Sequence, residues 1–486
     1  MKPLRIIPQE LTRRAFIRQA ACAAIGTAAL SATVRDLRFL NSAMAQTAPI
    51  TDYKALVCVF LSGGNDSNNL IVPTLTAEYA AYAAIRTPAL ALPQAGLLPI
   101  SPLNNDGHTY ALHPACPELQ TLFGESKLAL LFNTGTLVFP MTRAQYLAGV
   151  LSKPQQLFSH HDQVVQWQTS IPDRPSTTGW GGRCADLMAA VLPSAPISLS
   201  VSVAGANTFE VGQLVSPYAV TPNGAITLLE SSSPRLQAIQ NILGLPHADL
   251  QTQAYARVVD NAMNMSSLLT GAIQPTAAAN YWTVPFPASI TTPTSGTTFT
   301  SALGPQLQMI ARLIEAGNRG AANGGFGMKR QIFFCHVGGY DLHANQTPGP
   351  GSTATGAHAN LLAELSQSLL AFQRAMEQLG LSNNVTAFTA SDFGRTLVCN
   401  GLGSDHGWGG HHLILGGAVQ GQRTYGTFPA LAVNGPDDSG YGRWIPTTAI
   451  DQYFSTLASW FGVDSGNLDS VFPNLDRFSS PNLGFV

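Results

Sequence analysis

The sequence predicts an α/β protein with a mostly parallel central sheet that is covered by helices on both faces. Short apolar runs typical of buried strands alternate along the chain with longer segments of helical periodicity, and this alternation favours parallel strands joined by helices. Polar motifs directly follow several of these strands, in the place where open α/β sheets bind their ligands. No internal repeat is evident in the sequence.

The expected elements are placed by composition and periodicity. Strands are expected at 55–61, 127–133, 197–203, 331–337, 385–389 and 412–415. A helix is expected at 303–315, where leucines and isoleucines form one apolar stripe, and another at 357–379, before Gly380 in the position where helices commonly end. A third helix is expected at 447–461, after Pro446, because proline is favoured at helix starts.

The first residues resemble a twin-arginine export signal. Arg13 and Arg14 precede an Ala-rich apolar run at 20–34 and a small-residue cleavage site at 43–45. The run is shorter than the roughly 20 residues that a spanning helix needs. We therefore expect a signal peptide at 1–45, export by the twin-arginine translocase, and a periplasmic or extracellular protein without membrane attachment after cleavage.

The charge balance excludes some classes of function. The formal net charge is −2 and only 11% of the residues are charged, whereas about 25% is usual. The chain therefore has no basic surface for nucleic acid and no polybasic patch for anionic lipid. A small-molecule or surface-polymer substrate is the better expectation.

The expected mature chain, residues 46–486, is long enough for one enlarged α/β domain or for up to three domains. Between about 204 and 300 the sequence turns to Ser, Thr, Pro, Asn and Gly with weak periodicity, which indicates a peripheral region. The mature cysteines are odd in number and lack C-x-x-C spacing, so at most two disulfides can form. Cys58 and Cys335 lie in apolar strand-like runs and are expected to be buried thiols.

The first polar motif is the turn after the expected strand at 55–61. Gly63-Gly64-Asn65-Asp66 follows this strand, so the carboxylate of Asp66 should project from the strand's end. Because carboxylates bind divalent metals, Asp66 is a candidate metal ligand. An Asx-turn or a helix cap is the alternative role.

The second motif is Ser159-His160-His161-Asp162, at the expected start of a helix that continues through Trp167. A hydroxyl at a helix N-terminus can be presented to an anionic ester, because free backbone N–H groups face the phosphate or sulfate. Ser159 is therefore a candidate nucleophile and His160 a candidate catalytic residue. A helix cap is the alternative role of Ser159.

The third motif is Asp341-Leu342-His343, which follows the apolar strand at 331–337 and two glycines. Alternate residues of an extended segment share a face, so one ion can contact both the carboxylate and the imidazole. Asp341 and His343 are therefore expected to bind one metal ion.

The fourth motif, at 389–412, combines acidic residues, histidines and many glycines. Asp392 should emerge at the end of the strand before it, and Asp405, His406 and His411 follow. Glycines allow the backbone to fold tightly and approach a ligand closely. Neighbouring His411 and His412 face opposite ways in an extended segment, so at most one of them should be a ligand there.

Together these motifs resemble the family of exported proteins known as DUF1501. The resemblance extends over nearly all of residues 52–465 and is carried by FLSGGND, LHPACPEL, SHHDQ, GWGGR, GGYDLH, SDFGRT, SDHGWGGHH and GGAVQG. It implies an alkaline phosphatase/sulfatase-like three-layer sandwich and a site with a divalent metal (Zn, Ca, Mg or Mn). The superfamily's site residues imply metal-binding roles for Asp66, Asp341, His343, Asp392 and His406 or His411, with Ser159 as nucleophile.

The chain departs from the hydrolase pattern in two places. Asp392 is followed by Phe393, where the hydrolases commonly have His, and the Asp341/His343 spacing is tighter than in the phosphatases. Three outcomes are open: a histidine such as His160 or one in the 406–412 loop replaces the missing ligand, the site holds a single metal, or it holds none and no longer catalyses.

The resemblance implies an exported metal-dependent hydrolase of phosphate or sulfate esters. Arg395 and Arg183 are candidates to bind the equatorial oxygens of the ester. The alternative function is a non-catalytic exported protein that binds a surface glycan or a protein partner and keeps a structural or degenerate metal site. A serine esterase is disfavoured because the chain contains no G-x-S-x-G motif.

Overall fold

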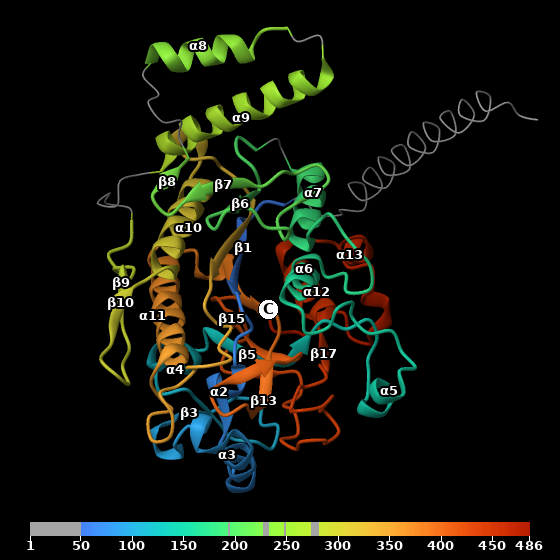
Figure 1. Cartoon of the computed structure of the whole chain (residues 1–486). Helices are drawn as coiled ribbons and strands as arrows, with labels where there is room; N and C mark the ends of the chain where they lie inside the picture. The colour runs from blue at the N-terminus through green and yellow to red at the C-terminus, as the bar shows by residue number, and fades with distance from the viewer. Residues whose placement is uncertain (1–49, 193–194, 227–232, 247–248, 274–280) are drawn as a thin grey trace, which may run out of the picture. The chain divides into compact units, whose positions relative to one another are not determined.

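A 10-stranded sheet runs through the computed structural model, which describes residues 50–192, 195–226, 233–246, 249–273 and 281–486 (Figure 1). Its strand order is β16-β5-β15-β12-β1-β11-β6-β7-β8, and β17 also pairs with β5. The strands are β1 (Lys54–Leu61), β5 (Leu128–Gly135), β6 (Ser200–Ser202), β7 (Tyr218–Thr221), β8 (Gly224–Ala225), β11 (Arg330–Val337), β12 (Val385–Ser391), β15 (Gly410–Leu415), β16 (Thr424–Tyr425) and β17 (Thr448–Ala449).

The three central strands of the sheet are parallel and end at the same level. β1 pairs in parallel with β11 on one side and β12 on the other, and Leu61 lies opposite both Val337 and Ser391. β15 is antiparallel to its neighbours β12 and β5. The prediction of a mostly parallel sheet is confirmed, and every strand expected from the sequence is present.

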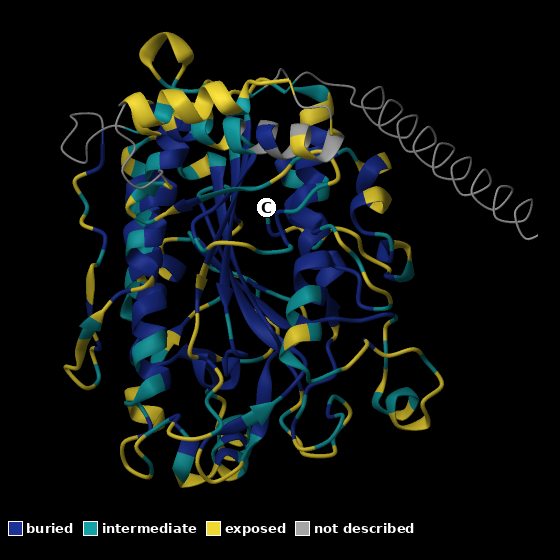
Figure 2. Cartoon of the chain, turned by 45° about the horizontal axis from the view of Figure 1, so that its top comes forward, coloured by how far each residue is buried: buried dark blue, intermediate teal, exposed yellow. Residues whose placement is uncertain are grey.

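Helices cover both faces of the sheet (Figure 1). One layer contains α4 (Pro117–Gly124), α10 (Leu303–Asn318) and α11 (Ala357–Gln378), and the other contains α6 (His160–Thr169), α7 (Trp180–Val191), α12 (Ile450–Phe461) and α13 (Leu468–Val471). The apolar stripe of α10 is fully buried, and Figure 2 shows the buried strands between the two helical layers. The predicted three-layer sandwich is therefore confirmed.

Smaller elements surround this sandwich. They are α2 (Ser67–Leu70), β2 (Ile71–Pro73), α3 (Thr76–Leu90), β3 (Leu98–Ile100), β4 (Tyr110–Leu112), α5 (Arg143–Ala148), β13 (Arg395–Cys399) and β14 (Ser404–His406). β2, β4 and β3 form a small antiparallel sheet, and β13 pairs with β14 as a hairpin. This hairpin follows β12 directly and returns the chain to the carboxyl end of the central strands.

The segment expected to be peripheral contains more regular structure than its weak periodicity indicates. Within 204–300 the structure has β7, β8, α8 (Ser233–Leu243), α9 (Leu250–Ala272), β9 (Ser289–Thr291) and β10 (Thr298–Thr300). The last predicted helix also starts later than expected, at Ile450, because Thr448 and Ala449 pair with β5 instead. The expected signal peptide at 1–45 lies outside the described residues.

The mature cysteines carry no disulfide in the described residues. Cys58, Cys116, Cys184 and Cys335 are buried free thiols, and Cys399 is half-buried. Burial raises the pKa of the Cys58 and Cys335 thiols, which keeps them protonated and inert. Among the described helices, none is both long and apolar enough to cross a membrane.

Candidate metal centre

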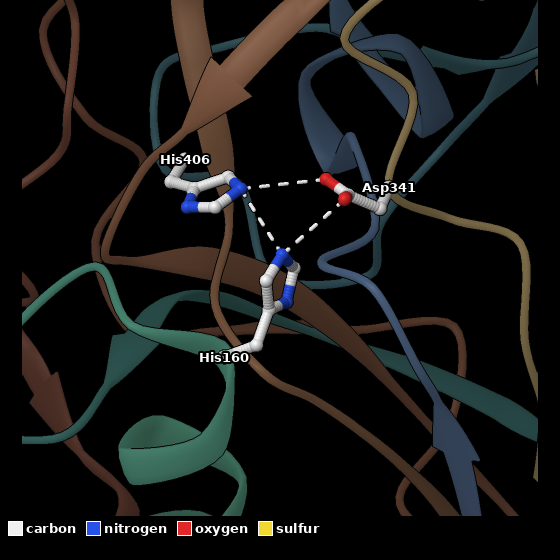
Figure 3. Close-up of side chains that lie close together, drawn as sticks. All are labelled: His160, Asp341 and His406. Atoms are coloured by element: carbon white, nitrogen blue, oxygen red, sulfur yellow. Dashed lines mark hydrogen bonds and ion pairs between the residues drawn. The ribbon is translucent and has the colours of Figure 1, made fainter.

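Three side chains from separate parts of the chain converge beyond the ends of the central strands (Figure 3). His160 opens α6, Asp341 lies four residues beyond the end of β11, and His406 ends β14. His160 Nε2 lies 3.0 Å from His406 Nε2 and 3.4 Å from Asp341 Oδ2, and His406 Nε2 lies 3.4 Å from Asp341 Oδ1. These three residues can hold one metal ion.

His343 joins this group from the other side of His406. Its Nε2 atom lies 2.8 Å from His406 Nε2 and 3.1 Å from Asp341 Oδ1. Asp341 and His406 are therefore shared by two overlapping sets of three donors, one completed by His160 and the other by His343. The side chains of Asp341 and His343 are 45% and 44% exposed, so the centre is open to solvent.

The second ring nitrogen of each histidine is held by an oxygen acceptor. His160 Nδ1 lies 2.7 Å from Asp392 Oδ2, and His343 Nδ1 lies 2.8 Å from Asp405 Oδ1. His406 Nδ1 lies 2.8 Å from the carbonyl oxygen of Phe158. These acceptors require Nδ1–H, and a neutral imidazole that carries its proton on Nδ1 leaves Nε2 as a bare lone pair. Three bare nitrogens crowded around one carboxylate repel one another unless a cation lies between them.

The donor set fits a divalent transition metal. Ligand atoms about 2.0–2.2 Å from a tetrahedral zinc ion lie about 3.3–3.6 Å apart, and the His160, Asp341 and His406 donors are 3.0 to 3.4 Å apart. Oxygen acceptors on the far ring nitrogens are the usual arrangement for metal-binding histidines. Imidazole is a better ligand for zinc-like ions than for calcium or magnesium.

Asp392 was predicted as a ligand, but the structure gives it a supporting role. Its Oδ2 atom accepts from His160, and its Oδ1 atom accepts from the backbone N–H of Gly63 at 2.9 Å. The ring of His160, one of the candidates to replace the histidine missing after Asp392, packs on Phe393 with centroids 4.8 Å apart. Asp405 supports His343 in the same manner.

The tight turn after β1 is required by this arrangement. Gly63 has a φ of +113°, and a Cβ atom there would lie 2.4 Å from the backbone nitrogen of Asp341. The glycines of the fourth motif have the same purpose, since a Cβ on Gly394 would lie 2.0 Å from the carbonyl oxygen of Gly409. The backbone segments that carry the ligands can therefore pack directly against one another.

The positive charge of Arg395 neutralises the Asp341 carboxylate. Its guanidinium is buried, forms an ion pair with the Asp341 carboxylate and donates to the carbonyl oxygens of Gly63, Gly64 and Tyr340. Partial burial alone would raise the pKa of Asp341, but the hydrogen bond and charge of Arg395 outweigh it and hold this pKa below its usual value. Arg395 thus keeps Asp341 ionised, and its donors are directed to the protein rather than to a substrate.

Asp66 is not part of the metal centre, contrary to the prediction. It is buried and forms an ion pair with the buried side chain of Arg86, and it also accepts from Gln346 Nε2 at 2.5 Å. Burial would raise the pKa of Asp66, but the charge of Arg86 outweighs it and lowers the net value. The carboxylate is therefore already neutralised inside the protein.

His411 and His412 also lie away from the cluster. Both are buried in β15, His411 Nδ1 accepts from the backbone N–H of Asn133 at 3.1 Å, and its ring stacks on Phe428. Burial lowers the pKa of each histidine to about 3, so both are neutral core residues. Of the two predicted alternatives, His406 is thus the one that reaches the centre.

Two further predicted residues are used by the fold. Ser159 is the N-cap of α6, and its hydroxyl donates to Asp162 Oδ2 at 2.7 Å; it makes no side-chain hydrogen bond to the helix backbone or to the described cluster. The guanidinium of Arg183 donates to the carbonyl oxygens of Thr169 and Val471. Arg183 therefore ties α6 to α13 and is not available to bind an ester.

A cleft of about 760 Å³ opens beside the metal centre. It is lined by Ser62, Gly63, Gly339, Asp341 and Asp392, which follow the central strands, and by one side of α6, beginning with His160. Ser62 was missed in the sequence, although it is the first polar residue after β1 and lies immediately before the glycine turn. Ser62 is the hydroxyl-bearing residue that directly follows β1. It lines the cleft, whereas Ser159 does not.

Residues 316–441 match the model of a protein family described as "Protein of unknown function (DUF1501)". This segment of the chain is similar to the DUF1501 family. It includes Asp341, His343, Asp392 and His406, so most of the candidate metal centre lies within it. No curated protein matches the sequence.

Several solved structures are similar to this chain at low sequence identity. Ps i-CgsB in complex with k-i-k-neocarrahexaose is 9% identical, with a TM-score of 0.32, over 88% of this chain and 78% of that chain. The phosphonate monoester hydrolase SpPMH from Silicibacter pomeroyi is 8% identical, with a TM-score of 0.31, over 84% and 73%. The α/β class of this chain follows from its own sheet and helical layers.

Proposed function

We propose that this protein is an exported, metal-dependent hydrolase of phosphate or sulfate esters. The observation that carries the proposal is the convergence of His160, Asp341 and His406 on one point at the edge of an open cleft. The supporting acceptors Asp392 and Asp405 orient two of the imidazoles around this point. A purely structural metal site is usually closed by protein ligands, whereas this one is exposed.

The residues of the centre have distinct roles in this proposal. His160, Asp341 and His406 would hold a divalent ion, with His343 as the alternative imidazole, and the ion would act as a Lewis acid on the ester. Arg395 keeps the Asp341 carboxylate charged, and Gly63 fixes Asp392 through its backbone N–H. The chain therefore positions an ionised carboxylate and oriented imidazoles before any substrate arrives.

Two hydroxyls are candidates for the attacking nucleophile. Ser159 lies next to His160 in the chain, and Asp162 accepts its hydroxyl proton at 2.7 Å, so a carboxylate is in place to withdraw that proton. Ser62 lines the cleft, between the strand end and the turn that contacts Asp392. The variants Ser62→Ala and Ser159→Gly distinguish the two hydroxyls.

Metal analysis combined with turnover tests the proposal. Purified mature protein, reconstituted with zinc, manganese, calcium or magnesium, should bind about one ion per chain and hydrolyse aryl phosphates or sulfates. Asp341→Asn should lose both properties, whereas the control Asp469→Asn, at an exposed position, should keep them. Absence of bound metal and of turnover in the wild type would instead favour a non-catalytic binding protein.

We also infer export by the twin-arginine route, supported by the arginine pair and the Ala-rich run that follows it. Lysine at both Arg13 and Arg14 should leave the precursor in the cytoplasm. Immunoblots of periplasmic and cytoplasmic fractions measure this directly, and normal export of the double variant would contradict the route.

A further inference from the structure

The cleft beside the metal centre has walls without charge. Val164, Val165 and Gln168 of α6 form one wall, and Ala206, Asn207 and Thr208 form another. Both valines are half-buried and Ala206 is exposed, so methyl groups face the space between the walls. His161 lies at the exposed edge of the α6 wall.

The amide side chains of these walls are engaged by the protein. Gln168 Oε1 accepts from the backbone N–H groups of Thr208 and Phe209, at 2.8 and 3.3 Å. Asn207 donates through Nδ2 to Glu210 Oε2 at 2.8 Å and accepts through Oδ1 from the backbone N–H of Glu210 at 3.0 Å. The Gln168 contacts fix the spacing of the walls, and the Glu210 contacts leave Asn207 little capacity to bind a ligand.

Charge at the cleft is confined to the metal centre. Asp341 and Asp392 are the acidic residues of the lining, and their oxygens are engaged by Arg395, His160 and Gly63. None of the described residues that line the cleft is a lysine or an arginine. An anionic group placed away from the centre would therefore lose water without gaining a cationic partner, which is unfavourable.

The size of the cleft limits the bound group as well. A volume of about 760 Å³ lies within the roughly 300–1,000 Å³ that is typical of small-molecule sites. A ligand group that fits this volume carries few charged substituents. The methyl groups of the lining favour contact with an apolar ligand surface.

We propose that the alcohol portion of the ester, which occupies this cleft, is a small, uncharged and partly apolar group, such as an aryl or alkyl alcohol. This inference rests on the proposed function for the position of the reacting ester. It decides against a segment of a polyanionic polymer as the group bound along α6.

Paired probes that differ by one charge test the inference. Phenyl phosphate and 4-carboxyphenyl phosphate, and the corresponding sulfates, share the reacting group and differ at the far end of the ring. With metal-reconstituted full-length mature protein, kcat/KM should be at least tenfold higher for the phenyl ester of the pair that is hydrolysed. Dissociation constants from titration calorimetry should differ in the same direction.

A lysine in the wall should weaken or abolish the preference. Val164→Lys supplies the missing cation and should reduce the discrimination against the carboxylated ester at least tenfold. The control Val150→Lys adds the same charge at a position that is 67% exposed and does not line the cleft, so it should leave the ratio unchanged. Thermal denaturation checks that both variants are folded.

The possible results separate the two proposals. Equal or better use of the carboxylated esters by the wild type would overturn the neutral-group inference while the hydrolase stands. Selective binding of the phenyl esters without turnover would support the inference and overturn the hydrolase. Neither binding nor turnover of any probe would overturn both.

Discussion

The ion pair between Arg86 and Asp66 provides the sharpest test of which acidic residues serve the fold and which serve the metal. The side chains are 0% and 3% exposed. Replacing Arg86 by Met keeps most of the side-chain stem but leaves Asp66 with hydrogen bonds from only the neutral amides of Gln346 and Asn68. Breaking a buried pair in this way costs about 3–5 kcal/mol, because the remaining charge is uncompensated.

Denaturation in guanidinium chloride, with metal content measured on the same samples, gives the comparison. Arg86→Met should lower the free energy of unfolding by about 3–5 kcal/mol without changing the bound metal per folded chain. The control Arg374→Met removes ion pairs with Glu125 and Glu377 whose side chains are 29% to 40% exposed, and should cost no more than about 1 kcal/mol. A loss below about 1 kcal/mol in Arg86→Met would refute the assignment of a stabilising buried pair.

The same pair has a defined pH dependence. The folded-state pKa of Asp66 lies below the unfolded value, so its contribution to stability is present above the unfolded pKa of about 3.9 and is lost as the pH falls through the folded value. Asp66→Asn should remove this acid-dependent part of the unfolding free energy. Loss of metal in Asp66→Asn would show instead that Asp66 is a ligand after all.

Three further predictions concern single side chains near the site. Burial raises the pKa of Glu210 to about 8, so between about pH 4.5 and 8 the folded state holds a proton that the unfolded state has lost. The free energy of unfolding should therefore fall as the pH rises through this range, and denaturation curves of Glu210→Gln should lack this fall. Asp392→Asn should weaken metal binding about 10–100-fold in a chelator competition, since the amide orients His160 less well, and unchanged affinity would contradict the supporting role. For the nucleophile, Ser62→Ala or Ser159→Gly should lower turnover by several orders of magnitude, whichever residue attacks; Ser159→Gly should stay close to wild-type thermal stability because glycine is tolerated at an N-cap.

The sequence predicted the central architecture because its signals are local. Each expected strand is an apolar run that is buried in the structure, as in β1 and β12, and the stripe of α10 has the periodicity of a helix packed on a sheet. The helix start expected at 447 was wrong by three residues, since pairing of Thr448 and Ala449 with β5 depends on a strand more than 300 residues away. The helices at 233–243 and 250–272 were missed because their sequences have weak periodicity.

The candidate site was predicted only where its signal is local in the sequence. The D-x-H spacing placed Asp341 and His343 together without any knowledge of the fold, and both residues lie in the cluster. Asp66 has an equally suggestive position after a strand, but its partner Arg86 lies 20 residues away on α3. No local pattern distinguishes a carboxylate that binds a metal from one that pairs with a buried guanidinium.

The sequence by itself determined the α/β class, the polar motifs that follow the strands, and the set of residues from which a metal centre could be built. Only the tertiary structure decided which of them meet: His160 arrives from α6, His406 from the β13–β14 hairpin and Asp341 from the turn after β11. The reason is physical, because burial and hydrogen bonding are set by neighbours distant in the chain. Burial assigns His411 to the core. Hydrogen bonding to His160 gives Asp392 the role of supporting an imidazole, and contact with His343 brings His406 into the centre.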